Sequence, residues 1–377
     1  MKKRVAVLGA TGSIGKSSLD IIARDSENFK PVLLTARSKS KELEELSIKF
    51  PSAVCNLTGE SEEGAEKLVK LINELKPDIT INGISGAAGL KPSLAAINSG
   101  SCLALANKET IVMAGRLAMR LAKEKNVNII PVDSEHSAIF HLLRGFSRGE
   151  HKENINNIVS EILLTASGGP FRNLSIEQMY NVSAQDALEH PTWNMGPKIT
   201  VDSASMANKG LEIIEACVFF DMPVDKIKVV IHPQSIVHSM IRLFNGVIYA
   251  QLSKPDMRHP IHDAIYWPDT TPSILEPVNF DSLTLEFSKP DLEKFPMLTI
   301  AQNVAKYGSL YPCAYNAANE IAVSAFLDKK IKFTDIPKIT SNVLDSDWSG
   351  DNMDLDIILK ADTAARIKAK SYILQSI

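Results

Sequence analysis

The alternation of strand-like and helix-like segments over residues 4 to about 130 is the feature that most constrains the fold. Apolar runs such as RVAVLGA, FKPVLLTAR and CLALAN alternate with amphipathic segments such as SIGKSSLDIIARD and KELEELSIKF. Strands that alternate with helices in this way form a parallel sheet with helices on both faces. We therefore predict an α/β protein whose first domain is built on such a sheet.

The pattern changes twice in the rest of the chain. After Pro131 the strand-like runs become longer, and KIKVVIHPQSIVHSMIRLF and VIYAQLS are joined at an Asn-Gly pair, which is typical of a β-hairpin. A proline-rich stretch follows, and the pattern is helical from Pro296 onward. We predict a nucleotide-binding domain over 1–130, an α+β central domain with a mostly open sheet over 131–266, a linker over 267–295 and a small helical domain over 296–377.

Composition argues against several classes of protein. The chain of 377 residues is 45% hydrophobic and 23% charged, and it has no apolar run of roughly 18 residues that would span a bilayer. We expect no targeting peptide, because the first predicted strand starts within the first few residues. A net charge of −3 without a basic block argues against nucleic acid, and four scattered cysteines argue against a zinc cluster or disulfides. We expect a cytoplasmic enzyme.

A glycine-rich segment, GATGSIG, lies between the first predicted strand and the first predicted helix. Gly9, Gly12 and Gly15 would permit a tight turn that approaches a pyrophosphate, and the helix N-terminus would supply free N–H groups. This spacing in this position favours a Rossmann-like dinucleotide site. A glycine turn without a cofactor is the alternative.

The end of the second strand indicates which dinucleotide is bound. Proteins that bind NAD usually carry an acidic residue there, whereas this chain has Ala36, Arg37 and Ser38. A guanidinium suits the 2′-phosphate of NADPH. We predict NADPH, with a solvated surface charge at Arg37 as the alternative.

Two carboxylates follow a predicted strand in PVDSEH. Asp133 and Glu135 are two residues apart, so on an extended segment they would point to the same side. Carboxylate oxygens are ligands suited to Mg²⁺ or Mn²⁺. A solvated turn is the alternative for such a pair.

The pattern of a second polar segment, TVDSASMANKGLE, predicts a strand followed by a helix. We predict Ser203 as the N-cap of this helix, which would make the helix start an anion site, and Lys209 would add a positive charge. Asn208 and Glu212 are four residues apart and would share one helical face. An ordinary amphipathic helix with solvated charges is the alternative.

Two further segments follow predicted strands. In ASGGPFR, Ser167, Gly168 and Gly169 could form a turn that binds phosphate. In ANKET, Lys108 would lie at the carboxyl end of a parallel strand, where α/β enzymes bind ligands. A single lysine in this position is more often a surface residue.

Together these segments resemble one family, that of 1-deoxy-D-xylulose 5-phosphate reductoisomerase. The resemblance runs from Arg4 to the C-terminal helices and rests on segments that occur in a fixed order: GATGSIG, INGISGAAGL, LANKE, PVDSEHSAIF, LLTASGGPFR, HPTWNMGPKITVDSASMANKGLE, IHPQSIVHSM, QLSKPDM and NAANE. It implies conversion of 1-deoxy-D-xylulose 5-phosphate to 2-C-methyl-D-erythritol 4-phosphate, in isoprenoid precursor synthesis. The implied cofactors are NADPH and Mg²⁺, Mn²⁺ or Co²⁺, and a homodimer through the hairpin strands is implied.

The resemblance also assigns residues. It implies a metal site of Asp133, Glu135 and Glu212, which with Lys108 and His190 would form the catalytic set. NADPH would contact Thr11, Gly12, Ser13, Ile14, Ala36, Arg37, Ser38, Asn107, Glu109 and Gly196. The substrate would be bound by Lys108, Ser134, Glu135, Ser167, His190, Trp193, Met195, Ser203, Asn208, Lys209, Glu212 and His238. Among these, Ser167, Ser203, Asn208 and Lys209 would bind the phosphate. Residues 186–197 would form a lid. Family members often have Gly-Lys-Asn where this chain has Ala-Arg-Ser, so the positive charge is kept.

Other classes of function fit the sequence less well. Short-chain dehydrogenases and epimerases need a Tyr-x-x-x-Lys pair, and none of the seven tyrosines has a lysine four residues later. A semialdehyde dehydrogenase needs a nucleophilic cysteine, and Cys102 lies in an apolar strand. A nucleotide sensor without enzymatic activity would need neither three carboxylates nor a lid.

Overall fold

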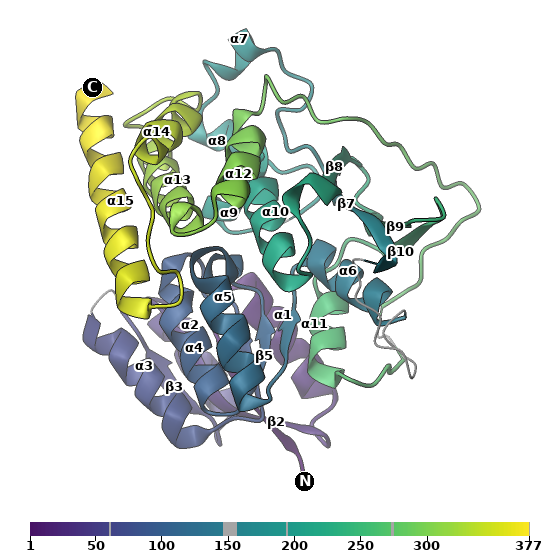
Figure 1. Cartoon of the computed structure of the whole chain (residues 1–377). Helices are drawn as coiled ribbons and strands as arrows, with labels where there is room; N and C mark the ends of the chain where they lie inside the picture. The colour runs from purple at the N-terminus through teal and green to yellow at the C-terminus, as the bar shows by residue number, and fades with distance from the viewer. Residues whose placement is uncertain (60–61, 146–156, 194, 273–274, 377) are drawn as a thin grey trace. The chain divides into compact units, whose positions relative to one another are not determined.

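The computed structural model describes residues 1–59, 62–145, 157–193, 195–272 and 275–376 (Figure 1). The described chain divides into two compact units. The first consists of Met1–Thr110, Leu117–Ser137 and Asp256–Glu276, and the second of Ile111–Arg116, Ala138–Pro255 and the chain from Pro277 onward.

The first unit is built on a parallel six-stranded sheet, in the order β3-β2-β1-β4-β5-β6. Its strands are β1 (Lys3–Leu8), β2 (Phe29–Ala36), β3 (Val54–Leu57), β4 (Ile79–Asn82), β5 (Cys102–Leu105) and β6 (Ile129–Pro131). All adjacent pairs are parallel, and the strand order reverses between β1 and β4. The predicted Rossmann-like fold is confirmed, and ligands in such folds bind at the point of reversal.

Helices connect the strands of this sheet. They are α1 (Ser13–Arg24), α2 (Ser40–Lys49), α3 (Glu62–Leu75), the short 3₁₀ helix η1 (Ala87–Gly89) with α4 (Leu90–Asn98), and α5 (Lys108–Lys125) (Figure 1). The last four residues of β1 are all fully buried, as expected for a strand covered on both faces. α6 (Ser134–Arg144) begins directly after the sheet.

One helix of the first unit comes from a distant part of the sequence. α11 (Arg258–Tyr266), which falls at the end of the expected central domain, packs against α1 in the first unit. The Tyr266 hydroxyl donates to Asp25 Oδ2 at 2.5 Å, and its ring meets Phe29 edge-on at 5.1 Å. This hydrogen bond lowers the pKa of Asp25. Contacts between residues so far apart in sequence leave no local pattern from which they could be predicted.

The second unit contains a four-stranded open sheet, in the order β10-β9-β7-β8. Its strands are β7 (Val159–Ala166), β8 (Ile227–Ile231), β9 (Val237–Leu243) and β10 (Ile248–Leu252), and η3 (Val224–Lys226) precedes β8. β7 is parallel to β8 and antiparallel to β9. The predicted hairpin joins β9 to β10, where Asn245 Oδ1 accepts from the Val247 N–H and Gly246 has a φ of +86°.

The segment after β7 is helical where the sequence predicted a strand. It contains α7 (Ile176–Met179), α8 (Ala184–Leu188), α9 (Pro197–Ala204) and α10 (Ala207–Phe219). The expected strand around Val201 is helical, because Pro197 stands at the first turn of α9, a position that suits proline. Ser203 therefore lies in the last turn of α9 and is not the N-cap of α10; that position belongs to Met206, with a φ of 62°.

The C-terminal part is helical, as predicted. It consists of α12 (Pro296–Tyr307), α13 (Tyr311–Leu327), α14 (Asp335–Leu344) and α15 (Leu355–Ser376), drawn in green to yellow in Figure 1. α13 packs against α12, α14 and α15, and its Tyr315 is one of the largest fully buried side chains. Over the described residues, no helix combines the length and the apolar character needed to cross a bilayer.

Candidate functional site

The glycine loop is shaped by contacts that exclude any side chain. A Cβ on Gly15 would lie 2.4 Å from Gly9 O and 2.5 Å from Ala10 Cα. Gly9 has a φ of +78°, and a Cβ there would lie 2.9 Å from Gly83 O in the loop after β4. The start of α1 is therefore pressed against the end of β1, at the point where the strand order reverses.

The predicted cofactor residues of this loop lie around the start of α1. Gly12 is its N-cap and no side chain caps the helix, while Gly12 and Ser13 are exposed, Thr11 is buried, and Ile14 would contact a Cβ on Gly83. Such an uncapped N-terminus offers N–H groups to an anion. The end of β2 is tied to the loop, since the Gly9 N–H donates to Thr35 Oγ1 at 3.1 Å. Ala36 is buried at that end, and Arg37 and Ser38 follow it as exposed residues.

Two predicted NADPH residues are engaged within the protein. Asn107 caps α5 by accepting from the Thr110 N–H at 3.0 Å, and its amide donates to Ile84 O at 2.7 Å. The same amide donates to Glu109 Oε2 at 2.9 Å. Asn107 therefore fixes the loop after β4 against the start of α5. Gly196 differs from the other predicted NADPH residues because it belongs to the second unit, where it is the N-cap of α9.

Lys108 is not the surface residue that a single lysine would usually be. Its side chain is 5% exposed, and Nζ lies 2.6 Å from Asp133 Oδ2. Lys108 is the first residue of α5 and Asp133 follows β6, so both lie at the carboxyl ends of neighbouring strands. A buried ammonium requires such a partner.

The sequence predicted an extended segment for Asp133 and Glu135. The structure differs, because α6 begins at Ser134. Asp133 Oδ1 instead accepts from the Glu135 N–H at 3.3 Å. Glu135 Oε2 accepts from the Ser134 hydroxyl at 2.5 Å, and both side chains are partly exposed. Because a carboxylate attracts the free N–H groups of a helix start, Asp133 is held in place by the first turn of α6.

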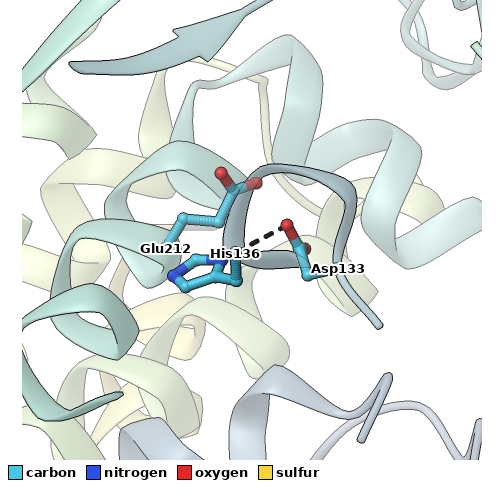
Figure 2. Close-up of side chains that lie close together, drawn as sticks. All are labelled: Asp133, His136 and Glu212. Carbon is cyan, nitrogen blue, oxygen red and sulfur yellow. Dashed lines mark hydrogen bonds and ion pairs between the residues drawn. The ribbon is translucent and has the colours of Figure 1, made fainter. Parts of the chain in front are cut away.

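His136 is a neighbour of Asp133 that the sequence did not reveal. It is fully buried, and its Nδ1 lies 3.3 Å from Asp133 Oδ1, as the dashed line in Figure 2 marks. A fixed imidazole beside a carboxylate restricts the orientation of that carboxylate. Its place one helical turn after Asp133 was the available signal. Glu212 of the second unit is also labelled in Figure 2.

In the second unit, Ser167 and His190 form a hydrogen-bonded pair. His190 Nδ1 accepts from the N–H groups of Thr192 and Trp193 at 3.1 and 2.9 Å, so the ring hydrogen is on Nε2. Nε2 donates to Ser167 Oγ at 3.1 Å, and the Gly169 N–H donates to the same oxygen at 3.2 Å. With both lone pairs engaged, the Ser167 hydroxyl can direct its own hydrogen to a ligand.

Burial, and secondarily the positive charge of Arg172, lowers the pKa of His190 from 6.5 to about 4. We expect the ring to stay neutral until the pH falls to about 4. The unfolded chain takes up this proton near pH 6.5, so the native state loses stability as the pH falls from 6.5 through 4.

The pKa of His190 can be measured directly from the NMR chemical shifts of its ring as a function of pH. His190→Gln should remove this part of the pH dependence of unfolding. Titration of the ring near pH 6.5 would contradict the prediction.

The expected lid, residues 186–197, starts within α8 and ends at the first residue of α9; Asn194 lies outside the described residues. Trp193 and Met195 are partly exposed. The Trp193 ring centroid is 6.4 Å from that of His238, whose Nε2 lies 2.8 Å from Ser253 Oγ. The structure thus places the rings of Trp193 and His238 beside each other.

The face of α10 predicted from the sequence is present, but its charges are buried. Asn208 donates to Glu212 Oε1 at 2.6 Å, and Lys209 Nζ forms an ion pair with Glu212 Oε2. Lys209 and Glu212 are both buried, and so is Glu215 on the same helix. The alternative of a solvated helix is therefore wrong.

Ser203 is placed beside the turn that holds Ser167. Gly168 and Gly169 have φ values of +83° and +68°, and a Cβ on Gly169 would lie 2.6 Å from Ser203 O. The turn after β7 therefore packs directly on the last turn of α9. The turn that contains Ser167 thus lies next to Ser203, by a route that the sequence did not indicate.

Known proteins match this chain over nearly its whole length. The family model described as 1-deoxy-D-xylulose 5-phosphate reductoisomerase matches residues 5–115, and two models of the C-terminal domains of that family match residues 129–220 and 252–368. A relative of that name from Pelodictyon phaeoclathratiforme is 45% identical, over 98% of this chain and 100% of the relative. The chain belongs to the 1-deoxy-D-xylulose 5-phosphate reductoisomerase family.

Other matches agree with this assignment. A relative of the same name from Treponema denticola is 45% identical, over 100% of this chain and 98% of the relative. The solved structure of the enzyme from Zymomonas mobilis in complex with NADPH is 39% identical, with a TM-score of 0.88 over 99% of both chains. A DOX-P reductoisomerase in complex with NADPH, fosmidomycin and magnesium is 38% identical, with a TM-score of 0.92 over 98% of both chains.

Proposed function

We infer that the chain converts 1-deoxy-D-xylulose 5-phosphate to 2-C-methyl-D-erythritol 4-phosphate with NADPH and a divalent cation, in isoprenoid precursor synthesis. The observation that carries this inference is the 45% identity to a relative of that name over essentially the full length of both chains. The side chains of both units offer the chemistry that this reaction needs.

The proposed ligands of the divalent cation are Asp133, Glu135 and Glu212. All three donors are carboxylate oxygens, which suit Mg²⁺ or Mn²⁺ better than a soft metal. Asp133 and Glu212 are each paired with a lysine, as buried negative charges require. When bound, the cation would polarise the substrate carbonyl and ease loss of a hydroxyl proton.

The substrate phosphate is assigned to Ser167, Ser203, Asn208 and Lys209. This assignment is supported by the hydroxyl hydrogen that Ser167 has available, by the packing of Gly169 on Ser203 and by the buried ammonium of Lys209. The phosphate is remote from the bonds that change. Its binding energy can therefore orient the reacting end of the sugar.

Lys108, Ser134 and His190 are the groups we assign to the sugar backbone. Lys108 Nζ and the Ser134 hydroxyl each contact a carboxylate, Asp133 and Glu135 respectively, which supports a place for them beside the proposed metal ligands. His190 is neutral and its Nε2 carries the hydrogen, so it can act as a hydrogen-bond donor.

Residues 186–197 are proposed to close over the bound sugar, with Trp193 and Met195 as covering side chains. The rearrangement breaks one C–C bond and forms another before NADPH reduces the branched aldehyde. A closed lid would keep the fragments together and exclude water. The partial exposure of both side chains is consistent with a segment that can move.

Arg37 is proposed to bind the 2′-phosphate of NADPH. It is exposed directly after β2, which is tied to the glycine loop through Thr35. The hydride would then come from a dinucleotide whose pyrophosphate is bound at the start of α1.

The proposed function is tested by following NADPH absorbance with 1-deoxy-D-xylulose 5-phosphate and either Mg²⁺ or Mn²⁺. We expect oxidation of NADPH that stops when the cation is chelated, and a much slower reaction with NADH. If no oxidation occurs with this sugar phosphate and either cation, the proposed function is wrong.

A homodimer is proposed to form through the β9–β10 hairpin. β10 is the edge strand of its sheet, and Phe244, Val247, Ile248 and Tyr249 are between 44% and 61% exposed. An apolar edge strand is a template for pairing with another strand, which supports a second copy of the chain as the partner.

We expect Ile248→Asp to convert the dimer to a monomer, because each copy would bury a carboxylate in an apolar interface without a cationic partner. Analytical ultracentrifugation measures the mass. Ile367→Asp on α15 is the matched control, since Ile367 is also exposed and should leave the mass unchanged. A wild-type mass for Ile248→Asp would exclude this interface.

A cytoplasmic location is proposed as well. It is supported by the four cysteines, Cys55, Cys102, Cys217 and Cys313, all of which are unpaired thiols in the structure. Burial raises the pKa of Cys102 to about 11, so this thiol is unreactive at neutral pH.

A further inference from the structure

The segment TVDSASMANKGLE contains a buried charge, Asp202, to which the proposed function gives no role. Asp202 lies in the last turns of α9 and is 1% exposed. Its Oδ2 forms an ion pair with Lys198 Nζ at 2.9 Å, one turn earlier on the same helix. Its Oδ1 accepts from Asn319 Nδ2 at 2.8 Å, on α13. Because a carboxylate only accepts, the amide nitrogen of Asn319 must be the end that faces it.

Asn319 lies on a face of α13 that contacts both of the segments proposed to bind phosphate. Asn319 contacts α9 through Asp202, the residue before Ser203. Tyr315, one turn earlier, contacts α10, where a Cβ on Gly210 would lie 2.6 Å from its hydroxyl. Gly210 follows Lys209. One face of α13 thus meets the immediate neighbours of Ser203 and Lys209.

α9 needs such a contact to have a fixed position. It has only eight residues, and a helix of this length is marginal without tertiary packing. Met206, in a left-handed conformation, separates α9 from α10, so the two helices do not form one continuous rod. The hydrogen bond between Asp202 and Asn319 attaches α9 to α13. Tyr315 of the same helix packs against α10.

We propose that Asn319 is a positioning residue for the substrate phosphate, which it sets through Asp202 and Ser203. The NAANE segment of the C-terminal helices thereby acts in the phosphate site without contacting the ligand. This inference rests on the proposed function, because the phosphate residues are those assigned above. It predicts an effect on substrate affinity that is separate from any effect on folding.

The test compares Asn319→Ala with Asn316→Ala in steady-state kinetics. Asn316 is a matched control, since it is also fully buried on α13, but it donates to Glu320 Oε1 at 3.1 Å instead of to Asp202. We expect Asn319→Ala to raise KM for 1-deoxy-D-xylulose 5-phosphate about tenfold, as for loss of a hydrogen bond to a charged group. KM for NADPH should not change in either variant, and Asn316→Ala should keep the wild-type KM for the sugar phosphate.

Two further variants separate positioning from stability. Asp202→Asn keeps the oxygen that accepts from Asn319, so we expect a KM for the sugar phosphate close to that of the wild type. The double variant Asp202→Asn with Asn319→Ala contains no buried carboxylate at this position, so it should fold even if Asn319→Ala does not. It should still show the raised KM, because the hydrogen bond is lost.

A wild-type KM in the double variant would overturn the proposal, as would an equal rise in KM for Asn316→Ala. Both comparisons of KM require a wild type that oxidises NADPH with the sugar phosphate. Absence of that reaction in the wild type would instead refute the proposed function.

Discussion

Glu212→Gln is expected to lower kcat by about a thousandfold, because it removes one of three proposed ligands of the cation. Glutamine has the shape of glutamate, so the packing around this fully buried side chain should be kept. The substitution removes the negative charge that Lys209 and Asn208 contact directly in the wild type. The remaining activity should require a much higher concentration of Mg²⁺ or Mn²⁺. Rates measured against cation concentration test both parts.

Glu320→Gln is the matched control for this experiment. Glu320 is also a largely buried carboxylate with a cationic partner, Arg366, at 2.6 Å, but it lies among the C-terminal helices. We expect it to lower the unfolding temperature while the cation dependence of the rate stays that of the wild type. If Glu212→Gln kept near-normal turnover at ordinary cation levels, Glu212 would not be a ligand.

The parts of the fold that the sequence predicted correctly are those with a local signal. β1, β2 and β5 are apolar runs next to amphipathic helices, and the β9–β10 hairpin has Asn245 and Gly246 at its turn. α9 was missed because its apolar residues resemble a short strand, whereas Pro197 at its first turn was the better guide. The place of α11 depends on Tyr266 and Asp25, which are far apart in sequence.

The sequence indicated candidate site residues, but it did not indicate the surroundings of their side chains. Spacing alone placed Asn208 and Glu212 on one face of a helix, and they are hydrogen-bonded. Spacing could not reveal that Lys108 and Lys209 are buried as partners of Asp133 and Glu212, because burial depends on the packing of distant segments. For the same reason the contact of Asn319 with Asp202 could not be predicted, and the one sequence signal for His136 was its place one helical turn after Asp133.

Gly15→Ala is expected to weaken NADPH binding by about a hundredfold, because it should displace the start of α1 from the glycine loop. Alanine would ordinarily stabilise a helix by about 1 kcal/mol relative to glycine. Here its Cβ would lie 2.4 Å from Gly9 O and 2.5 Å from Ala10 Cα, which are backbone atoms that cannot rotate away. The helix must therefore shift, and its free N–H groups shift with it. Titration of the enzyme with NADPH, followed by the fluorescence of the cofactor, measures the affinity.

Loss of affinity has to be distinguished from a general loss of stability, and Gly100→Ala in the same unit provides the comparison. Gly100 has a φ of +85° with no heavy atom within 4 Å of the Cβ position, so alanine there meets backbone strain but no clash. That strain costs roughly 1–2 kcal/mol. Gly100→Ala should therefore lower the unfolding temperature without changing NADPH affinity, whereas Gly15→Ala should change both. Wild-type affinity in Gly15→Ala would mean that the loop binds the cofactor without close contact between α1 and β1.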